Sequence, residues 1–168
     1  MIKNLAIITV LFILQFATSC GFTVLYDQKT TGLNYEKELA AIKIQKDAGT
    51  TSQELRTAIY NAINPDHFNE EIKYYLVLNS SESISSTFLT SAGSSGRNKL
   101  NMTVKYELKS YKNDRLVTSG IVKDSESYNV NLNRYGTYTA EEFARSNLAK
   151  ALSQKIRNLL VQDIIELR

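Results

Sequence analysis

Residues 100–109 read LNMTVKYELK, and apolar and polar side chains alternate along them without interruption. The even-numbered residues are apolar, whereas the odd-numbered ones are polar or charged. Because successive side chains of a β-strand point to opposite faces, this period predicts a strand with one dry and one wet face. The dry face needs a cover of other apolar side chains.

The flanking segments predict two further strands next to this one. Residues 71–90 form a long strand whose second half turns polar, and residues 91–96 (SAGSSG) form a flexible connector. After residues 100–109, Lys-Asn-Asp at 112–114 is typical of a turn. A fourth strand is expected over residues 115–128, where Gly120 suggests a bulge.

A short first strand is predicted over residues 38–45, and a helix follows it. Thr51 and Glu54 have the spacing of a capping box, in which each side chain satisfies the other residue's backbone N–H. An apolar stripe then recurs at helical spacing: Leu55, Ala58, Ile59, Ala62 and Ile63. Asn64-Pro65 ends the helix, because proline disfavours the α conformation in the residue before it.

A second, longer helix is predicted near the end of the sequence. Residues 129–138 are expected to be a loop, and Thr139 and Glu142 repeat the capping-box spacing. The stripe of this helix is Ala144, Leu148, Ala151, Leu152, Ile156, Leu159 and Leu160. The order β-α-β-β-β-α predicts an α+β fold, a two-layer sandwich with two helices packed on one face of a four-stranded, mostly antiparallel sheet.

The start of the chain has the pattern of a secretory signal. Lys3 is followed by an apolar run over residues 5–16 and by small residues at 17–19. The run is shorter than the roughly 20 residues that a membrane-spanning helix needs. Cys20, the single cysteine, comes next. This arrangement resembles the lipobox of bacterial lipoproteins, whose cysteine carries diacylglycerol and becomes the mature N-terminus.

A lipidated Cys20 would explain a lone cysteine in an exported chain, although a free thiol behind an ordinary signal peptide is the alternative. Gly21 in place of an aspartate favours the outer membrane over the inner one. We therefore predict a lipoprotein signal peptide over residues 1–19, a lipidated tether over 20–37 and a single α+β domain over 38–168.

Composition argues against nucleic acid as a partner, and motifs argue against an enzyme. The net charge is only +3 over 168 residues. The only histidine, His67, follows Asp66, but neither a nucleophile motif nor a metal-ligand set accompanies the pair. We expect no catalytic site, no metal and no cofactor. A lipid-anchored hydrolase that uses His67 is the alternative, and an active His67→Ala variant would exclude it.

Several short segments resemble the LptE family, the lipopolysaccharide-assembly lipoproteins of the outer membrane, most of all the alphaproteobacterial branch. They are Cys20-Gly21-Phe22 with Leu25-Tyr26, Arg97-x-x-Leu100, Val104-x-Tyr106-x-Leu108 and Ser127-Tyr128-Asn129. The resemblance implies a protein that is lipid-anchored on the periplasmic side of the outer membrane. Such a protein plugs the LptD β-barrel, helps it to assemble and binds lipopolysaccharide. The alternative is another periplasm-facing outer-membrane lipoprotein, an adaptor of a secretion or envelope complex.

The expected topology brings three basic residues to one end of the sheet: Arg97, Lys99 and Arg134. Their side chains could pair with lipid A phosphates by charge-assisted hydrogen bonds, or could serve only as solubilising charge. Tyrosines on the wet faces of the strands could line a hydrated barrel lumen, or could simply build the sheet. The candidates for a barrel contact are Tyr75, Tyr111 and Tyr128.

Overall fold

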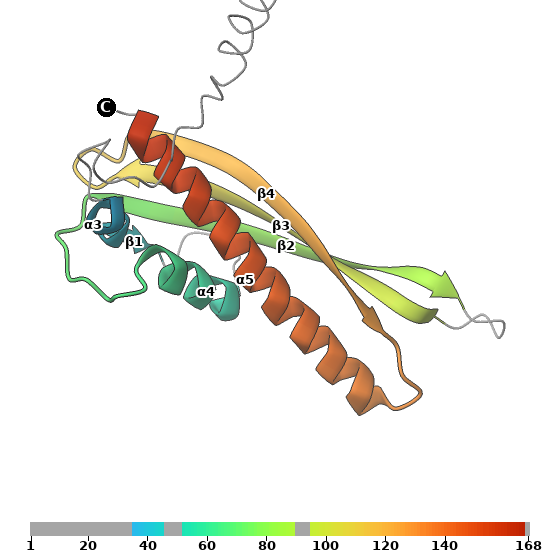
Figure 1. The fold of residues 1–168 in the computed structure, drawn as a ribbon. Coiled ribbons are helices and arrows are strands. Elements are labelled where there is room, and N and C mark those ends of the chain that lie inside the picture. Colours follow the sequence, from blue (N-terminus) through green and yellow to red (C-terminus); the bar gives the residue numbers. More distant parts are fainter. Residues whose placement is uncertain (1–34, 46–51, 90–94, 167–168) are drawn as a thin grey trace, which may run out of the picture. The chain divides into compact units, whose positions relative to one another are not determined.

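The computed structural model describes residues 35–45, 52–89 and 95–166 of the chain. All of them belong to one compact unit, Asn34–Arg168. The elements are α3 (Tyr35–Ala40), β1 (Ile42–Ile44), α4 (Gln53–Ile63), β2 (Tyr74–Leu89), β3 (Ser95–Ser110), β4 (Leu116–Asn129) and α5 (Arg134–Glu166), and Figure 1 labels them. The signal peptide and most of the tether lie outside the described residues, so both stay predictions.

One four-stranded sheet has the order β1-β2-β3-β4. The short strand β1 runs parallel to β2, whereas the long strands β2, β3 and β4 pair antiparallel. The pairing sets Leu78, Tyr106 and Gly120 in one row across the three long strands. Even-numbered residues of all three strands therefore share a face along that row. The predicted α+β class and the mostly antiparallel sheet are confirmed.

The core lies between this face and the helices. In Figure 1, α5 crosses the three long strands, and α4 lies beside it. The dry face predicted from β3 is confirmed, because Leu100, Met102, Val104, Tyr106 and Leu108 are all buried. The helices contribute the other half of the core: Leu55, Ile59 and Ile63 from α4, and Leu148, Leu152, Ile156 and Leu160 from α5. Among the described helices, none is both long and apolar enough to cross a membrane.

The first strand is shorter than the predicted 38–45, because a helix occupies the start of that range. Helix α3 ends at Ala40, and only Ile42–Ile44 pair with β2. Tyr35 and Leu39 are both buried, and their spacing of four residues puts them on one side of the helical turn. Tyr35–Lys37, the end of the expected tether, are thus part of this helix.

Ser52 caps α4, and Thr51, the predicted capping residue, lies outside the described residues. The Ser52 hydroxyl oxygen accepts a hydrogen bond from the backbone N–H of Leu55 at 3.3 Å, which satisfies one free donor of the first turn. The predicted end at Asn64 is confirmed. The Asn64 side chain accepts from the Phe68 backbone N–H at 2.8 Å and donates to the Phe68 carbonyl at 2.9 Å. These two bonds hold the loop that follows the helix.

The long helix α5 begins six residues earlier than the capping box at Thr139 predicts. The Asn133 side-chain oxygen accepts from the backbone N–H of Tyr135 at 2.9 Å, so this asparagine caps the helix. Thr139 lies inside the helix, where its hydroxyl donates to the Tyr135 carbonyl at 3.0 Å. The predicted loop over 129–138 is correspondingly reduced to residues 130–133.

The predicted bulge at Gly120 is wrong, since its pairing with Tyr106 is regular. The irregularity of this strand pair lies between Leu108 and Lys109. Glycine is needed at position 120 for another reason. A Cβ atom there would lie 2.6 Å from the Tyr106 hydroxyl oxygen and 2.7 Å from two ring carbons. The Tyr106 ring thus lies over the bare backbone of the neighbouring strand.

Candidate binding surfaces

The sheet face that turns away from the helices carries most of the polar residues of β3 and β4. We call it the outer face. Its members on β3 are Arg97, Lys99, Asn101, Thr103, Lys105, Glu107 and Lys109, and those opposite them on β4 are Ser119, Ile121, Lys123, Ser125, Ser127 and Asn129. Cations outnumber acids on this face, because five of these positions are Lys or Arg and only Glu107 is acidic.

Two of the three expected cationic candidates meet at one end of the outer face. Arg97 and Lys99 line a hollow of 670 Å³ together with Thr87, Gly96, Ser127 and Asn129. The Arg97 Nε donates to the Asn129 side-chain oxygen at 3.3 Å, and the Thr87 hydroxyl donates to the Arg97 carbonyl at 3.1 Å. Basic side chains with short hydroxyl and amide neighbours are a chemistry that suits a phosphate group.

The third candidate, Arg134, is not among the residues that line this hollow. It is the first residue of α5, on the other layer of the sandwich. Its neighbours along the chain are exposed apolar and aromatic residues, Leu132, Tyr135 and Tyr138. The expected grouping therefore holds for Arg97 and Lys99 within the hollow and does not extend to Arg134.

The three tyrosine candidates for a barrel contact also separate. Tyr128 is only 5% exposed, because its even position on β4 turns it towards α5. Its hydroxyl donates to Glu141 at 3.1 Å, and burial raises the pKa of the phenol. Tyr128 is therefore part of the core and is withdrawn as a surface candidate. Tyr75 and Tyr111 pack edge to face, with ring centroids 5.2 Å apart, and Tyr111 is exposed.

Two groups of ion pairs join the helix-facing side of the sheet to α5. Arg145 of α5 donates to Glu82 of β2 at 3.0 Å, to Glu141 at 2.8 Å and to Glu142. Partial burial on its own would lower the pKa of Arg145, but the bonds to Glu82 and Glu141 outweigh it and raise that pKa. This cluster joins the second half of β2, which contains Glu82, to α5.

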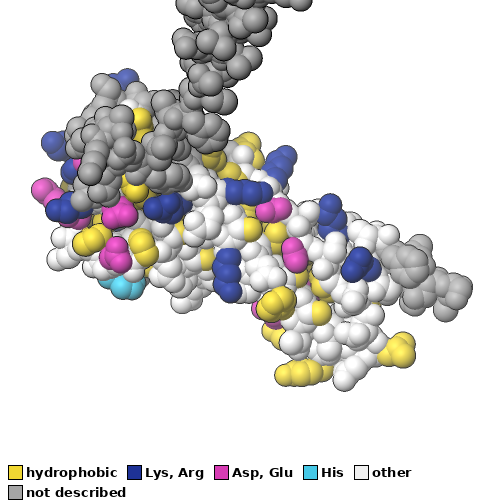
Figure 2. All heavy atoms as spheres, viewed as in Figure 1, with side chains coloured by type: hydrophobic (Ala, Val, Ile, Leu, Met, Phe, Trp, Pro, Cys, Tyr) yellow, Lys and Arg dark blue, Asp and Glu magenta, His cyan; other side chains and the backbone are white. Residues whose placement is uncertain are grey.

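A second ion pair joins α5 to β4. Lys155 donates to the Asp124 carboxylate at 2.8 Å and to the Lys123 carbonyl at 3.4 Å. The bond from Lys155 lowers the pKa of Asp124 below its usual value. Figure 2, viewed from the helix side, shows basic and acidic side chains intermixed on this part of the surface.

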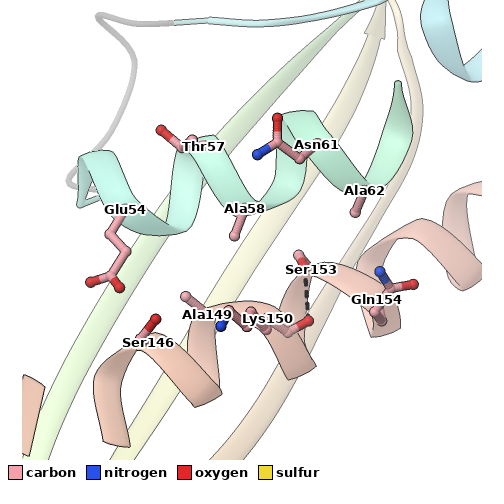
Figure 3. Close-up of a pocket in the computed structure, with 10 residues that line it drawn as sticks. All are labelled: Glu54, Thr57, Ala58, Asn61, Ala62, Ser146, Ala149, Lys150, Ser153 and Gln154. Atoms are coloured by element: carbon pink, nitrogen blue, oxygen red, sulfur yellow. Dashed lines mark hydrogen bonds between the residues drawn. The ribbon is translucent and has the colours of Figure 1, made fainter. Parts of the chain in front are cut away.

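Other features of the described residues offer little chemistry. His67 is exposed, and its ring stacks on that of Tyr60 with the centroids 5.9 Å apart. A groove of 520 Å³ runs between α4 and α5, and Figure 3 shows that small and polar residues line it, including Ala58, Ala149 and Ser153. Within the described part of the chain, no cluster of three or more His, Cys, Asp or Glu residues could hold a metal ion.

Comparison with known proteins finds similar folds but no similar sequences. No family model and no curated protein match the chain. Among solved structures, a protein from Caulobacter crescentus that is named as a lipoprotein superimposes with a TM-score of 0.64 at 20% identity, covering 81% of this chain and 98% of that one. Rare lipoprotein B from Shewanella oneidensis gives 0.60 at 10% identity, with 75% and 97% covered.

A minor lipoprotein from Acinetobacter baumannii gives a TM-score of 0.54 at 14% identity, covering 73% of this chain and 89% of that one. The chain has the fold of these lipoproteins. Because the proteins are matched over nearly their whole length, the shared part is a complete domain and not a single motif.

Proposed function

We propose that this chain is a lipid-anchored outer-membrane lipoprotein that faces the periplasm, plugs and helps to assemble an LptD-like β-barrel, and binds lipopolysaccharide. The observation that carries the proposal is the shared fold with rare lipoprotein B, the name of an LptE-like family. The lipobox-like sequence at Cys20 and the short motifs that resemble the LptE family support it independently. In this function the protein acts by binding and not by covalent chemistry.

The membrane anchor in this proposal is acylation of Cys20. Several acyl chains on one residue hold a protein at a membrane firmly, since each buried methylene contributes about 0.8 kcal/mol. Mass spectrometry of the chain from its native host should find residues 1–19 removed and diacylglycerol on the Cys20 sulfur. A full-length chain with a free thiol contradicts the anchor.

The lipopolysaccharide site in this proposal is the hollow at Arg97 and Lys99. Lipid A phosphates would replace water at these two cations, with the Ser127 hydroxyl and the Asn129 amide within the same hollow. The double variant Arg97→Glu with Lys99→Glu should lose about tenfold or more in lipopolysaccharide affinity at physiological salt, because attraction becomes repulsion at two contacts.

The matched control reverses two exposed cations away from the outer face, Lys112→Glu with Lys150→Glu. It changes the net charge equally and should bind lipopolysaccharide as the wild type does. Equal binding by both double variants would remove the hollow as the site. Arg134→Glu, tested separately, shows whether the cation at the start of α5 contributes.

The barrel partner is tested by purifying the tagged, lipidated chain from outer membranes of the native host. A large β-barrel that co-purifies in a stable ratio supports the plug. Recovery of secretion or envelope components without such a barrel favours the adaptor instead.

A further inference from the structure

We propose that the middle of the outer face, centred on Lys105 and Lys123, is the surface that docks against an acidic, hydrated wall of a protein partner. The inference rests on the proposed function, in which that partner is the β-barrel and the wall is the inside of its lumen. It assigns the barrel contact to a site separate from the lipopolysaccharide hollow at Arg97 and Lys99.

Lys105 and Lys123 lie diagonally on neighbouring strands of the outer face. Lys105 pairs with Ile121 and Lys123 pairs with Thr103, so the two lysines are cross-strand diagonal neighbours, about 7–8 Å apart along such a diagonal. Both side chains are exposed. Within the described part of the chain, neither ammonium has a carboxylate at ion-pair distance.

The surroundings leave these two positive charges uncompensated. The acid of the outer face, Glu107, contacts Lys109 at 3.3 Å. The remaining neighbours on β3 and β4 are short polar side chains and one isoleucine, and β2 adds two polar ones: Asn101, Thr103, Ser119, Ile121 and Ser125, with Asn79 and Ser81 on β2. The ion pairs of Arg145 and Lys155, in contrast, each join two elements of the domain. Lys105 and Lys123 make no such ion pair between elements. Their charges therefore suit a binding partner of opposite charge.

The layout favours a protein wall over a glycolipid. Apart from Ile121, the neighbours of Lys105 and Lys123 are short and polar, so they offer acyl chains little apolar contact. A second copy of this chain does not fit either, since two outer faces would oppose like charges. A polar, acidic wall of another protein meets both conditions.

The test compares two double charge reversals in the full, lipidated chain. Lys105→Glu with Lys123→Glu should lower the amount of co-purified barrel about tenfold at low salt, because like charges then face each other. Raising the salt should weaken the wild-type complex and narrow that difference, since exposed charges are screened. Lys112→Glu with Lys150→Glu is the control with the same net charge, and should recover the barrel as the wild type does.

Lipopolysaccharide binding by the same proteins separates this inference from the proposed function. Lys105→Glu with Lys123→Glu should leave that binding intact, whereas Arg97→Glu with Lys99→Glu should reduce it. If the wild type recovers no barrel, the proposed function fails. If the wild type recovers it and the Lys105/Lys123 reversal recovers as much as the control, the inference alone fails. It also fails if that reversal weakens lipopolysaccharide binding and leaves the barrel bound.

A neutral variant guards against misfolding. Lys105→Ser with Lys123→Ser gives these positions the side chain of their neighbours and should still lower barrel recovery, by less than the reversal does. Should the reversal fail to fold, an undiminished recovery with the neutral variant overturns the inference.

Discussion

Lys123 and Asp124 are adjacent in sequence but lie on opposite faces of β4, and they use their charges differently. Asp124, on the helix-facing side, binds Lys155 of α5 at 2.8 Å. The Lys123 ammonium, on the outer face, has no such carboxylate among the described residues. The charge of Asp124 thus joins the two layers, whereas the charge of Lys123 makes no ion pair with a described residue.

The same contrast extends to the apolar residues. On the helix-facing side, Val122 is 6% exposed and packs in the core, whereas its neighbour Ile121 on the outer face is 58% exposed. At these two neighbouring positions, packing therefore constrains the helix-facing residue and not the outer one. Substitutions should show the difference as free energies of unfolding.

The largest effect is expected at the centre of the core. Leu152 of α5 is fully buried, so Leu152→Ala should lower the free energy of unfolding by about 2–5 kcal/mol, from lost burial and the cavity left behind. Ile121→Ala on the outer face is the matched control and should change it by less than about 0.5 kcal/mol. Denaturant titration of both variants measures the difference. Similar losses for the two would mean that the outer face is covered within the domain.

An intermediate effect is expected where a side chain meets bare backbone. Gly120→Ala would place a methyl group 2.6 Å from the Tyr106 hydroxyl oxygen, so the ring must move. We expect a loss of about 1–3 kcal/mol, typical of overpacking. In a Tyr106→Ala background the same Gly120→Ala change should cost much less, because the ring is gone. A double-mutant cycle with additive effects would contradict this contact.

Sequence periodicity predicts the faces of the sheet well but helix starts poorly. The alternation over residues 100–109 identifies the buried face of β3, because a period of two leaves no choice once one face is apolar. The helix starts depend instead on which of several capping residues is used. Ser52 competes with Thr51, and Asn133 competes with Thr139, and all three residue types favour N-cap positions.

The surface residues were harder to predict from the sequence, because their positions depend on contacts between residues that are far apart in the chain. Arg97 and Lys99 could be grouped because they lie on one strand, two residues apart. Placing Arg134 and Tyr128 required the start of α5 and the parity of β4, and both were ambiguous in the sequence. The Arg145–Glu82 contact joins residues 63 apart, and no local pattern signals it. Lys105 could have been singled out from the wet face of β3 alone, but its partner Lys123 needs the register with β4.

The smallest effect is expected for the Asp124–Lys155 ion pair, and pH reveals it. The bond from Lys155 lowers the pKa of Asp124 below its usual 3.8 in the folded state. A carboxylate with a lowered pKa stabilises the fold fully above the unfolded-state value, and this contribution is lost as the pH falls through the folded-state value. Near neutral pH, Asp124→Asn should therefore cost about 0.2–1 kcal/mol, the range of partly exposed pairs.

Denaturant titration over acidic pH measures the difference in the free energy of unfolding between wild type and Asp124→Asn. This difference should disappear as the pH falls below 3.8 towards the folded-state pKa of Asp124. High salt should reduce the same free-energy difference at neutral pH, because the Asp124–Lys155 pair is partly exposed and salt screens its attraction. Lys123→Gln is the neighbouring control and should leave the free energy of unfolding unchanged at every pH. If Lys123→Gln destabilises the domain as much as Asp124→Asn does, the outer lysine also serves the fold. The positive charge of Lys123 would then not indicate a binding partner.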